Sequence, residues 1–191
     1  VIYALGLTVG PVLVGASLSL TTWLITQSLA AVPAHWPLAD LLPIRQLQQL
    51  LDSFNAFFPA VTAILDLEGR VLQASGWQDA CTKFHRKVSA SCRNCTESDT
   101  FLAANVRPGE FVAYRCKNGL WDVVTPLYVD GVHAGNLYTG QFFYDDEVID
   151  EAWFAECATR FGYDPATYLD AIRRVPRVKR SHVEHVMKFL V

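Results

Sequence analysis

The chain has 191 residues, enough for one ordinary domain with an appendage or for two very small domains. Its net charge of −3 and the absence of a dense run of Lys and Arg argue against a nucleic-acid-binding surface. Hydrophobic residues make up 51% of the chain, and their excess lies at the front, where no charged residue precedes Asp40.

The N-terminal segment, residues 1–31, consists of apolar and small residues throughout. Such a run is long enough to cross a membrane as a helix, and it lacks the basic start of a signal peptide. Gly6, Gly10 and Gly15 suit close helix packing in lipid. We therefore predict a transmembrane-like helix at residues 1–31, with a buried helix of a soluble core as the alternative.

A linker and an amphipathic helix follow. Residues 32–43 contain three prolines, which prevent one continuous helix and predict a linker. From residue 44 onward, apolar residues recur at helical spacing until Pro59. They are Ile44, Leu47, Leu50, Leu51, Phe54 and Phe58. The folded domain is therefore expected to span residues 44–191.

Five strands are predicted from β-branched or alternating runs between turn signals. The first two, residues 61–66 and 71–75, form a hairpin around Glu68-Gly69. The other three, residues 110–116, 120–129 and 132–143, have short links that predict an antiparallel meander.

Helices are predicted between the second and third strands and at the C-terminus. The inserted helices cover residues 78–87 and 96–105, with Cys92 and Cys95 between them. The C-terminal helices cover 147–161, 165–173 and 181–190, and the acidic residues 145–147 are expected to serve the first helix N-terminus. The predicted fold is α+β, a PAS-like five-stranded antiparallel sheet with inserted and C-terminal helices, preceded by the transmembrane-like helix.

The cysteines are the most specific chemical feature. Their odd number argues against a disulfide scaffold, and Cys157 fits a small buried residue of a helix. Four others lie in the central region: Cys81, Cys92, Cys95 and Cys116. The C-x2-C pair suits one soft metal, so zinc held by these four thiolates, or with His85, is one prediction. Free or redox-active thiols and a disulfide remain alternatives.

Aromatic residues in and beside the predicted sheet form a second candidate site. They are Trp77, Phe84, Trp121, Tyr138, Phe142 and Phe143, interleaved with the polar residues His85, Asp122, Thr125, Asn136 and Gln141. Apolar walls with a few directed polar groups are typical of a small-molecule pocket, and a plain hydrophobic core is the alternative. No sequence motif for a nucleophile elbow, phosphate loop, zinc protease or dinucleotide site occurs, so we expect no enzyme.

Two resemblances carry these expectations further. The string GRVLQASGWQDACTKFH, residues 69–85, resembles the opening motif of the PocR sensory domain. The later blocks Cys95-x2-Ser98-Asp99, Cys116-Lys117-Asn118-Gly119-Leu120, Thr125-Pro126, Thr139-Gly140-Gln141-Phe142-Phe143 and Ala171-x3-Val175-Pro176 extend the resemblance to residues 38–190. Separately, LTVGPVLVGASLSLTTWL, residues 7–24, resembles one transmembrane helix of the YihY/BrkB family of bacterial inner-membrane proteins.

The PocR resemblance implies a ligand-binding sensory domain of a bacterial signal-transduction protein, which recognises a small organic molecule such as a short diol. The ligand-binding residues expected are Trp77, Phe84, His85, Trp121, Gln141 and Phe143. A cysteine-based metal or redox switch is the alternative function. The expected partners are a signalling output domain or protein outside this chain and a second copy in a homodimer. The YihY/BrkB resemblance implies an inner-membrane protein with a cytoplasmic sensor; without that helix we expect a cytoplasmic protein.

Overall fold

The computed structural model describes residues 37–103 and 106–191. Its helices are α2 (Leu38–Leu41), α3 (Ile44–Phe57), the π-helix η1 (Ala80–His85), α4 (Ser89–Ala103), α5 (Glu151–Phe161), α6 (Pro165–Arg173) and α7 (Arg180–Leu190). Its strands are β1 (Val61–Leu65), β2 (Val71–Ser75), β3 (Val112–Arg115), β4 (Trp121–Val129), β5 (Val132–Tyr144) and β6 (Arg177–Val178).

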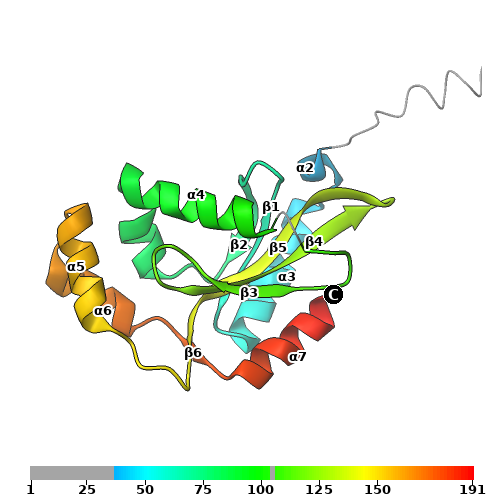
Figure 1. Ribbon diagram of the computed structural model, residues 1–191. Helices are drawn as coiled ribbons and strands as arrows, with labels where there is room; N and C mark the ends of the chain where they lie inside the picture. Colours follow the sequence, from blue (N-terminus) through cyan, green and yellow to red (C-terminus); the bar gives the residue numbers. More distant parts are fainter. Residues whose placement is uncertain (1–36, 104–105) are drawn as a thin grey trace, which may run out of the picture. The chain divides into compact units, whose positions relative to one another are not determined.

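The strands form one sheet in the order β2-β1-β5-β4-β3, with all neighbours antiparallel (Figure 1). The five predicted strands and the α+β class are confirmed. A sixth strand, β6, pairs in parallel with the end of β5. Its two residues are too few to show the alternation by which a strand is recognised in a sequence.

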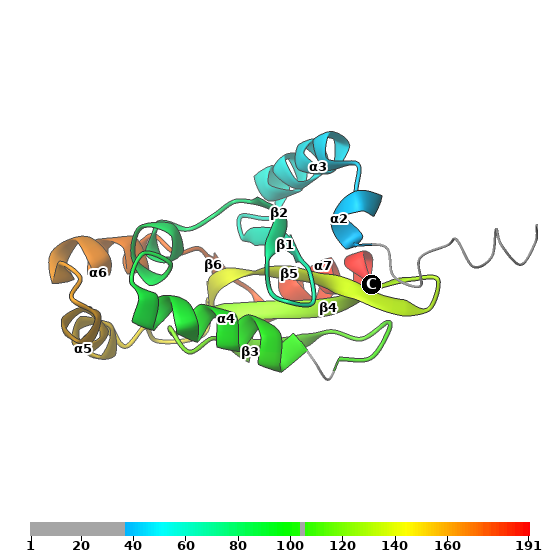
Figure 2. The same ribbon diagram turned by 90° about the horizontal axis from the view of Figure 1, so that it is seen from above.

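The two faces of the sheet are covered by different helices, with α4 on one side and α3 and α7 on the other (Figures 1 and 2). Alternation along β1 produces this division. Val61, Ala63 and Leu65 join an apolar cluster with Tyr138, whereas Ile64 packs with residues of α2, α3 and α7. We call the face that carries Tyr138 the inner face.

Helices α5 and α6 lie next to η1 at one end of the sheet (Figure 1). Their core contains the fully buried residues Phe143, Phe154 and Ile172, together with Cys157. Cys157 therefore is the small buried side chain that was expected. Asp164 caps α6 by accepting a hydrogen bond from Thr167 N at 2.9 Å, and Pro165 opens the helix.

Three predicted boundaries are wrong. Helix α4 begins at Ser89, so Cys92 and Cys95 lie within it rather than between two helices. Helix α5 begins four residues later than predicted because Asp150 caps it, with Trp153 N donating to Asp150 Oδ1 at 2.9 Å. The acidic residues upstream therefore do not serve this helix. The described part of the predicted linker contains α2, whose Leu38 is buried.

The predicted transmembrane-like helix at residues 1–31 lies outside the described residues. Among helices in residues 37–103 and 106–191, none is long and apolar enough to cross a membrane.

The β3–β4 turn offers a test of packing at the end of the sheet. Gly119 has φ +91°, and a Cβ there would lie 2.6 Å from the Trp153 ring, whereas Gly109 has φ +77° with no atom within 4 Å of an added Cβ. Both Gly→Ala substitutions strain the backbone, but only Gly119→Ala also overpacks the turn. We predict that Gly119→Ala lowers the free energy of unfolding by roughly 1–3 kcal/mol more than Gly109→Ala. Urea unfolding measures both, and equal losses would show that the contact with Trp153 is unimportant.

Candidate ligand-binding site

A half-buried ion pair lies between the inner face of the sheet and the helices that cover it. Arg86 directly follows η1, and its Nη2 donates to Asp99 Oδ2 of α4 at 3.2 Å. The guanidinium also lies 4.9 Å from the centroid of the Trp77 ring, in cation–π geometry. Its Nε is buried and has no hydrogen-bond partner. Such an unpaired buried donor is costly, and a molecule can reach it only if the surrounding side chains move.

Two tyrosines extend this pair onto the sheet. The Tyr114 hydroxyl, from β3, donates to Asp99 Oδ1 at 3.5 Å, and the Tyr138 hydroxyl, from β5, donates to the Asp99 carbonyl. Burial raises the pKa of both phenols, so both remain neutral. Burial also raises the pKa of Asp99, against the lowering effect of the Arg86 charge.

Asp122 of β4 adds a second, half-buried carboxylate. It lies opposite Gly140 of β5, where any Cβ would collide with the carboxylate. The register shifts here, because Trp121 pairs with Phe142 and leaves Gln141 as a bulge with φ +59°. The Gln141 backbone N–H then donates to Asp122 Oδ1 at 3.1 Å. The bulge therefore holds the carboxylate over the strand.

Burial raises the pKa of Asp122 to about 7, and the nearby Asp99 charge adds to the effect. The Gln141 N–H and the Cys116 thiol, by hydrogen bonding, act in the opposite direction. We call Arg86, Asp99, Tyr114, Asp122 and Tyr138 the interior polar cluster. Strongly shifted titratable groups that face each other in this way are typical of functional sites.

Three thiols border the cluster. Burial raises the pKa of Cys81 and Cys116 well above the usual range, and that of Cys95 to about 11, so these thiols stay protonated. All five cysteines, each within the described residues, are free. In residues 37–103 and 106–191 no three His, Cys, Asp or Glu side chains are grouped to hold a metal ion. The geometry thus gives no support to zinc at Cys81, Cys92, Cys95 and Cys116.

Two of the six predicted ligand-binding residues lie at the cluster. Trp77 stacks with Arg86, and the Gln141 side chain accepts a hydrogen bond from Gln78 N at 3.0 Å, which fixes the segment leading into η1. Trp121 lies elsewhere: its Nε1 donates to Glu147 Oε2 at 3.1 Å, and its ring packs on Tyr144.

The other three predicted residues belong to the core between η1, α5 and α6. His85 is 1% exposed, and its Nε2 shares a 2.7 Å hydrogen bond with the Tyr168 hydroxyl. Burial lowers the pKa of His85 to about 4, with a smaller effect from the Arg86 charge, so the imidazole is neutral. Phe84 packs on Tyr168, and Phe143 packs on Phe154. In the structure these three side chains pack in the hydrophobic core, and their predicted role in ligand binding stays a prediction.

Three members of the cluster are absent from the predicted site: Arg86, Asp99 and Tyr114. Arg86 directly follows His85, which was expected to face the interior. A charged residue next to an interior position is a sequence signal for a buried charge. Asp99 lies four residues after Cys95 in the helical region, which places both on one face of α4. Neither signal identifies the partner, because the ion pair spans 13 residues and two helices.

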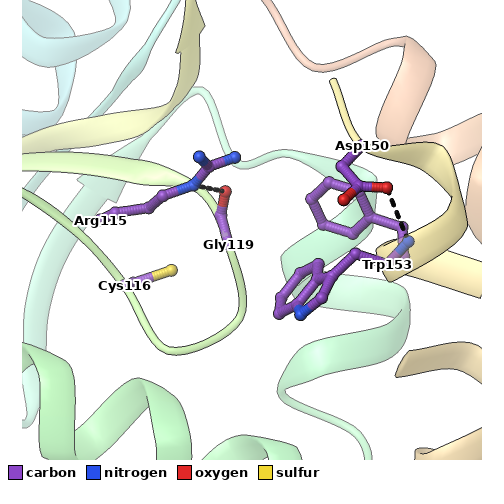
Figure 3. Close-up of a pocket in the computed structure, with 6 residues that line it drawn as sticks. Arg115, Cys116, Gly119, Asp150 and Trp153 are labelled. Atoms are coloured by element: carbon purple, nitrogen blue, oxygen red, sulfur yellow. Dashed lines mark hydrogen bonds between the residues drawn. The ribbon is translucent and has the colours of Figure 1, made fainter. Parts of the chain in front are cut away.

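Two cavities flank the cluster. One, of about 360 Å³, is lined by Arg115, Cys116, Gly119, Asp150, Trp153 and Phe154 (Figure 3), and we call it the Cys116 pocket. The other, of about 250 Å³, includes Asp66, Asp99, His133 and Asn136 in its lining. Asp99 therefore connects the second cavity to the interior polar cluster, whereas the first cavity has none of the five cluster residues in its lining.

The buried Asp122 carboxyl predicts a pH-dependent stability. Because its folded-state pKa of about 7 exceeds the ordinary 3.8, the contribution is full below 3.8 and is lost as pH rises through 7. Between pH 3.8 and 7, the free energy of unfolding of the wild type should therefore decrease with rising pH. The decrease should be about 1 kcal/mol per pH unit more than that of Asp122→Asn. Asn keeps the acceptor for Gln141 N–H but cannot titrate. Parallel pH profiles in urea unfolding would contradict the assignment.

Comparison with known proteins gives one match. The family model described as the sensory domain found in PocR matches residues 40–191. No curated protein and no solved structure matches the chain. The YihY/BrkB resemblance of residues 7–24 is supported by none of these comparisons. Because the match to the PocR model covers far more than half of the chain, the chain belongs to the family of PocR sensory domains.

Proposed function

We propose that the interior polar cluster binds a small uncharged organic molecule that carries hydroxyl groups, such as a short diol. Membership of the PocR family supports a ligand-binding sensory role in signalling. The observation that carries the proposal is the unpartnered, buried Arg86 Nε in the same cluster as Asp122. A donor without a partner and a nearby carboxyl group are complementary to a hydroxyl group, which both accepts and donates hydrogen bonds.

The charge balance of the cluster favours an uncharged ligand. Arg86 and Asp99 neutralise each other, and Asp122, with a pKa of about 7, carries only part of a charge at neutral pH. A charged ligand would have to be desolvated without a free counter-charge. A hydroxyl can accept from Arg86 Nε and donate to Asp122, and the half-buried Trp77 ring offers an apolar surface to a short carbon chain.

The same cluster argues for binding without catalysis. The neighbouring thiols of Cys81, Cys95 and Cys116 have raised pKa values, which makes them poor nucleophiles. His85, the one imidazole close to them, is tied to Tyr168 and has a lowered pKa. No observation favours the alternative of a cysteine-based metal or redox switch.

A route for the signal begins at the Gln141 bulge, because β5 continues from there to the C-terminal segment. Phe143 N donates to the Pro176 carbonyl at 2.9 Å, and Tyr144 pairs with Val178 of β6. The Arg180 guanidinium at the start of α7 lies 3.8 Å from the centroid of the Tyr144 ring. A ligand that binds one arrangement of the bulge better than another would shift the position of α7.

The role of Arg86 is tested by Arg86→Lys, which keeps a cation for Asp99 but has no Nε donor. In a thermal-shift titration with propane-1,2-diol and related short diols, we expect a saturable rise in Tm for the wild type. The substitution should weaken binding by about tenfold, the value of one hydrogen bond to a charged group. Arg160→Gln, on the exposed surface of α5, is the control and should bind as the wild type does.

The same titration can fail in two informative ways. A wild-type Tm that no short diol, alcohol or aldehyde raises would remove the proposed ligand class. A rise that Arg86→Lys and Asp122→Asn leave unchanged would place the ligand outside the interior polar cluster.

A further inference from the structure

The Cys116 pocket has an aromatic wall that the proposed function does not use. Trp153 of α5 lies on one side of this cavity and Cys116 on the other (Figure 3), and Phe154 also lines it. Gly119 packs so closely on the Trp153 ring that a Cβ would lie 2.6 Å from it. A volume of about 360 Å³ is in the range of small-molecule sites.

The positively charged side chain of Arg115 lies on the side of the pocket formed by the β3–β4 turn. Arg115 Nε donates to the Gly119 carbonyl at 3.0 Å, which holds the guanidinium beside the cavity (Figure 3). Its Nη1 has a long contact of 3.7 Å with Glu147 Oε2, an atom that already accepts from Trp121 Nε1 at 3.1 Å. The guanidinium therefore retains donors for a ligand.

The carboxylate of Asp150 lies on the side of the pocket formed by α5. Asp150 Oδ1 accepts from Trp153 N at 2.9 Å, which fixes the carboxylate at the start of the helix (Figure 3). The neighbouring acids are paired, Asp146 with Arg180 at 2.8 Å and Glu151 with Arg173 at 2.6 Å. Among the ion pairs of the described residues, none includes Asp150.

We infer that the Cys116 pocket is a second ligand site, for a small zwitterion that has an ammonium and a carboxylate group together with an apolar side chain, as in a free α-amino acid. Arg115 and Asp150 face one cavity but do not pair with each other. A simple anion would meet the Asp150 charge, and a simple amine the Arg115 charge. A zwitterion satisfies both, and Trp153 receives its apolar side chain.

This site is distinct from the interior polar cluster, which favours an uncharged molecule. The two approach each other at Cys116, which lines the pocket and is close enough to Asp122 to influence the pKa of its carboxyl group. A ligand in the pocket would therefore change the surroundings of Asp122, which makes the two sites candidates for coupling. The inference about the pocket does not depend on what the cluster binds.

Three matched probes test the charge requirement with the full chain: L-leucine, 4-methylpentanoate, which lacks the ammonium group, and 3-methylbutylamine, which lacks the carboxylate. Calorimetric titration should show that L-leucine binds about tenfold more tightly than either. Arg115→Gln should remove the preference for L-leucine over the amine. Asp150→Asn, which keeps the helix cap, should remove the preference over the carboxylate. Asp145→Asn, on the exposed surface, should change neither.

Amide chemical shifts locate the binding. L-Leucine should perturb the Gly119 amide and the Trp153 indole N–H more than the Gln141 amide. Equal affinity for all three probes, no binding of L-leucine, or a perturbation centred on Gln141 would each overturn the inference. Because diol binding at the cluster is measured separately, either site can fail without the other.

Discussion

The carboxylate of Asp122 lies over Gly140, and the inner face of the sheet is arranged around it. A side chain at position 140 would exclude the carboxylate, and the bulge at Gln141 turns a backbone N–H toward it. A regular strand would put that N–H into the ladder instead. The positive φ at Gln141 is thus the local strain that places a buried acceptor in the interior. The other polar groups, Arg86 and Asp99 above all, complete the charge balance around it.

Polar groups of this cluster connect α4 and the end of η1 to the sheet. Asp99 of α4 receives hydrogen bonds from Arg86 after η1 and from two tyrosines on β3 and β5. Buried ion pairs contribute little net stability, because desolvation offsets most of the attraction. Such ion pairs do, however, restrict how the helices and the sheet can pack, because each charge must keep its partner. A ligand that replaces one of these contacts therefore acts on η1, α4 and the sheet together.

The sequence predicts the framework of this fold and only part of its site. The hairpin around Glu68-Gly69 and the two tight turns of the meander follow from local chemistry, and all are confirmed. Strand β6 is too short to carry a pattern. His85 illustrates the limit for the site: its type and its place in the PocR-like motif favoured ligand binding. Its partner, however, is Tyr168, 83 residues away, which makes it a core residue. Arg86 and Asp99 were missed because only the folded chain brings them together.

The most direct measurement of the central claim is an NMR pH titration of the Asp122 side-chain carboxyl carbon, with and without a short diol. We expect a midpoint near 7 in the free domain, because the carboxyl group is desolvated close to Asp99. A saturating ligand should move this midpoint, because a hydroxyl group bound at Asp122 changes its hydrogen bonding. A midpoint in the ordinary range of exposed aspartates, unaffected by any ligand that binds the domain, would contradict the account.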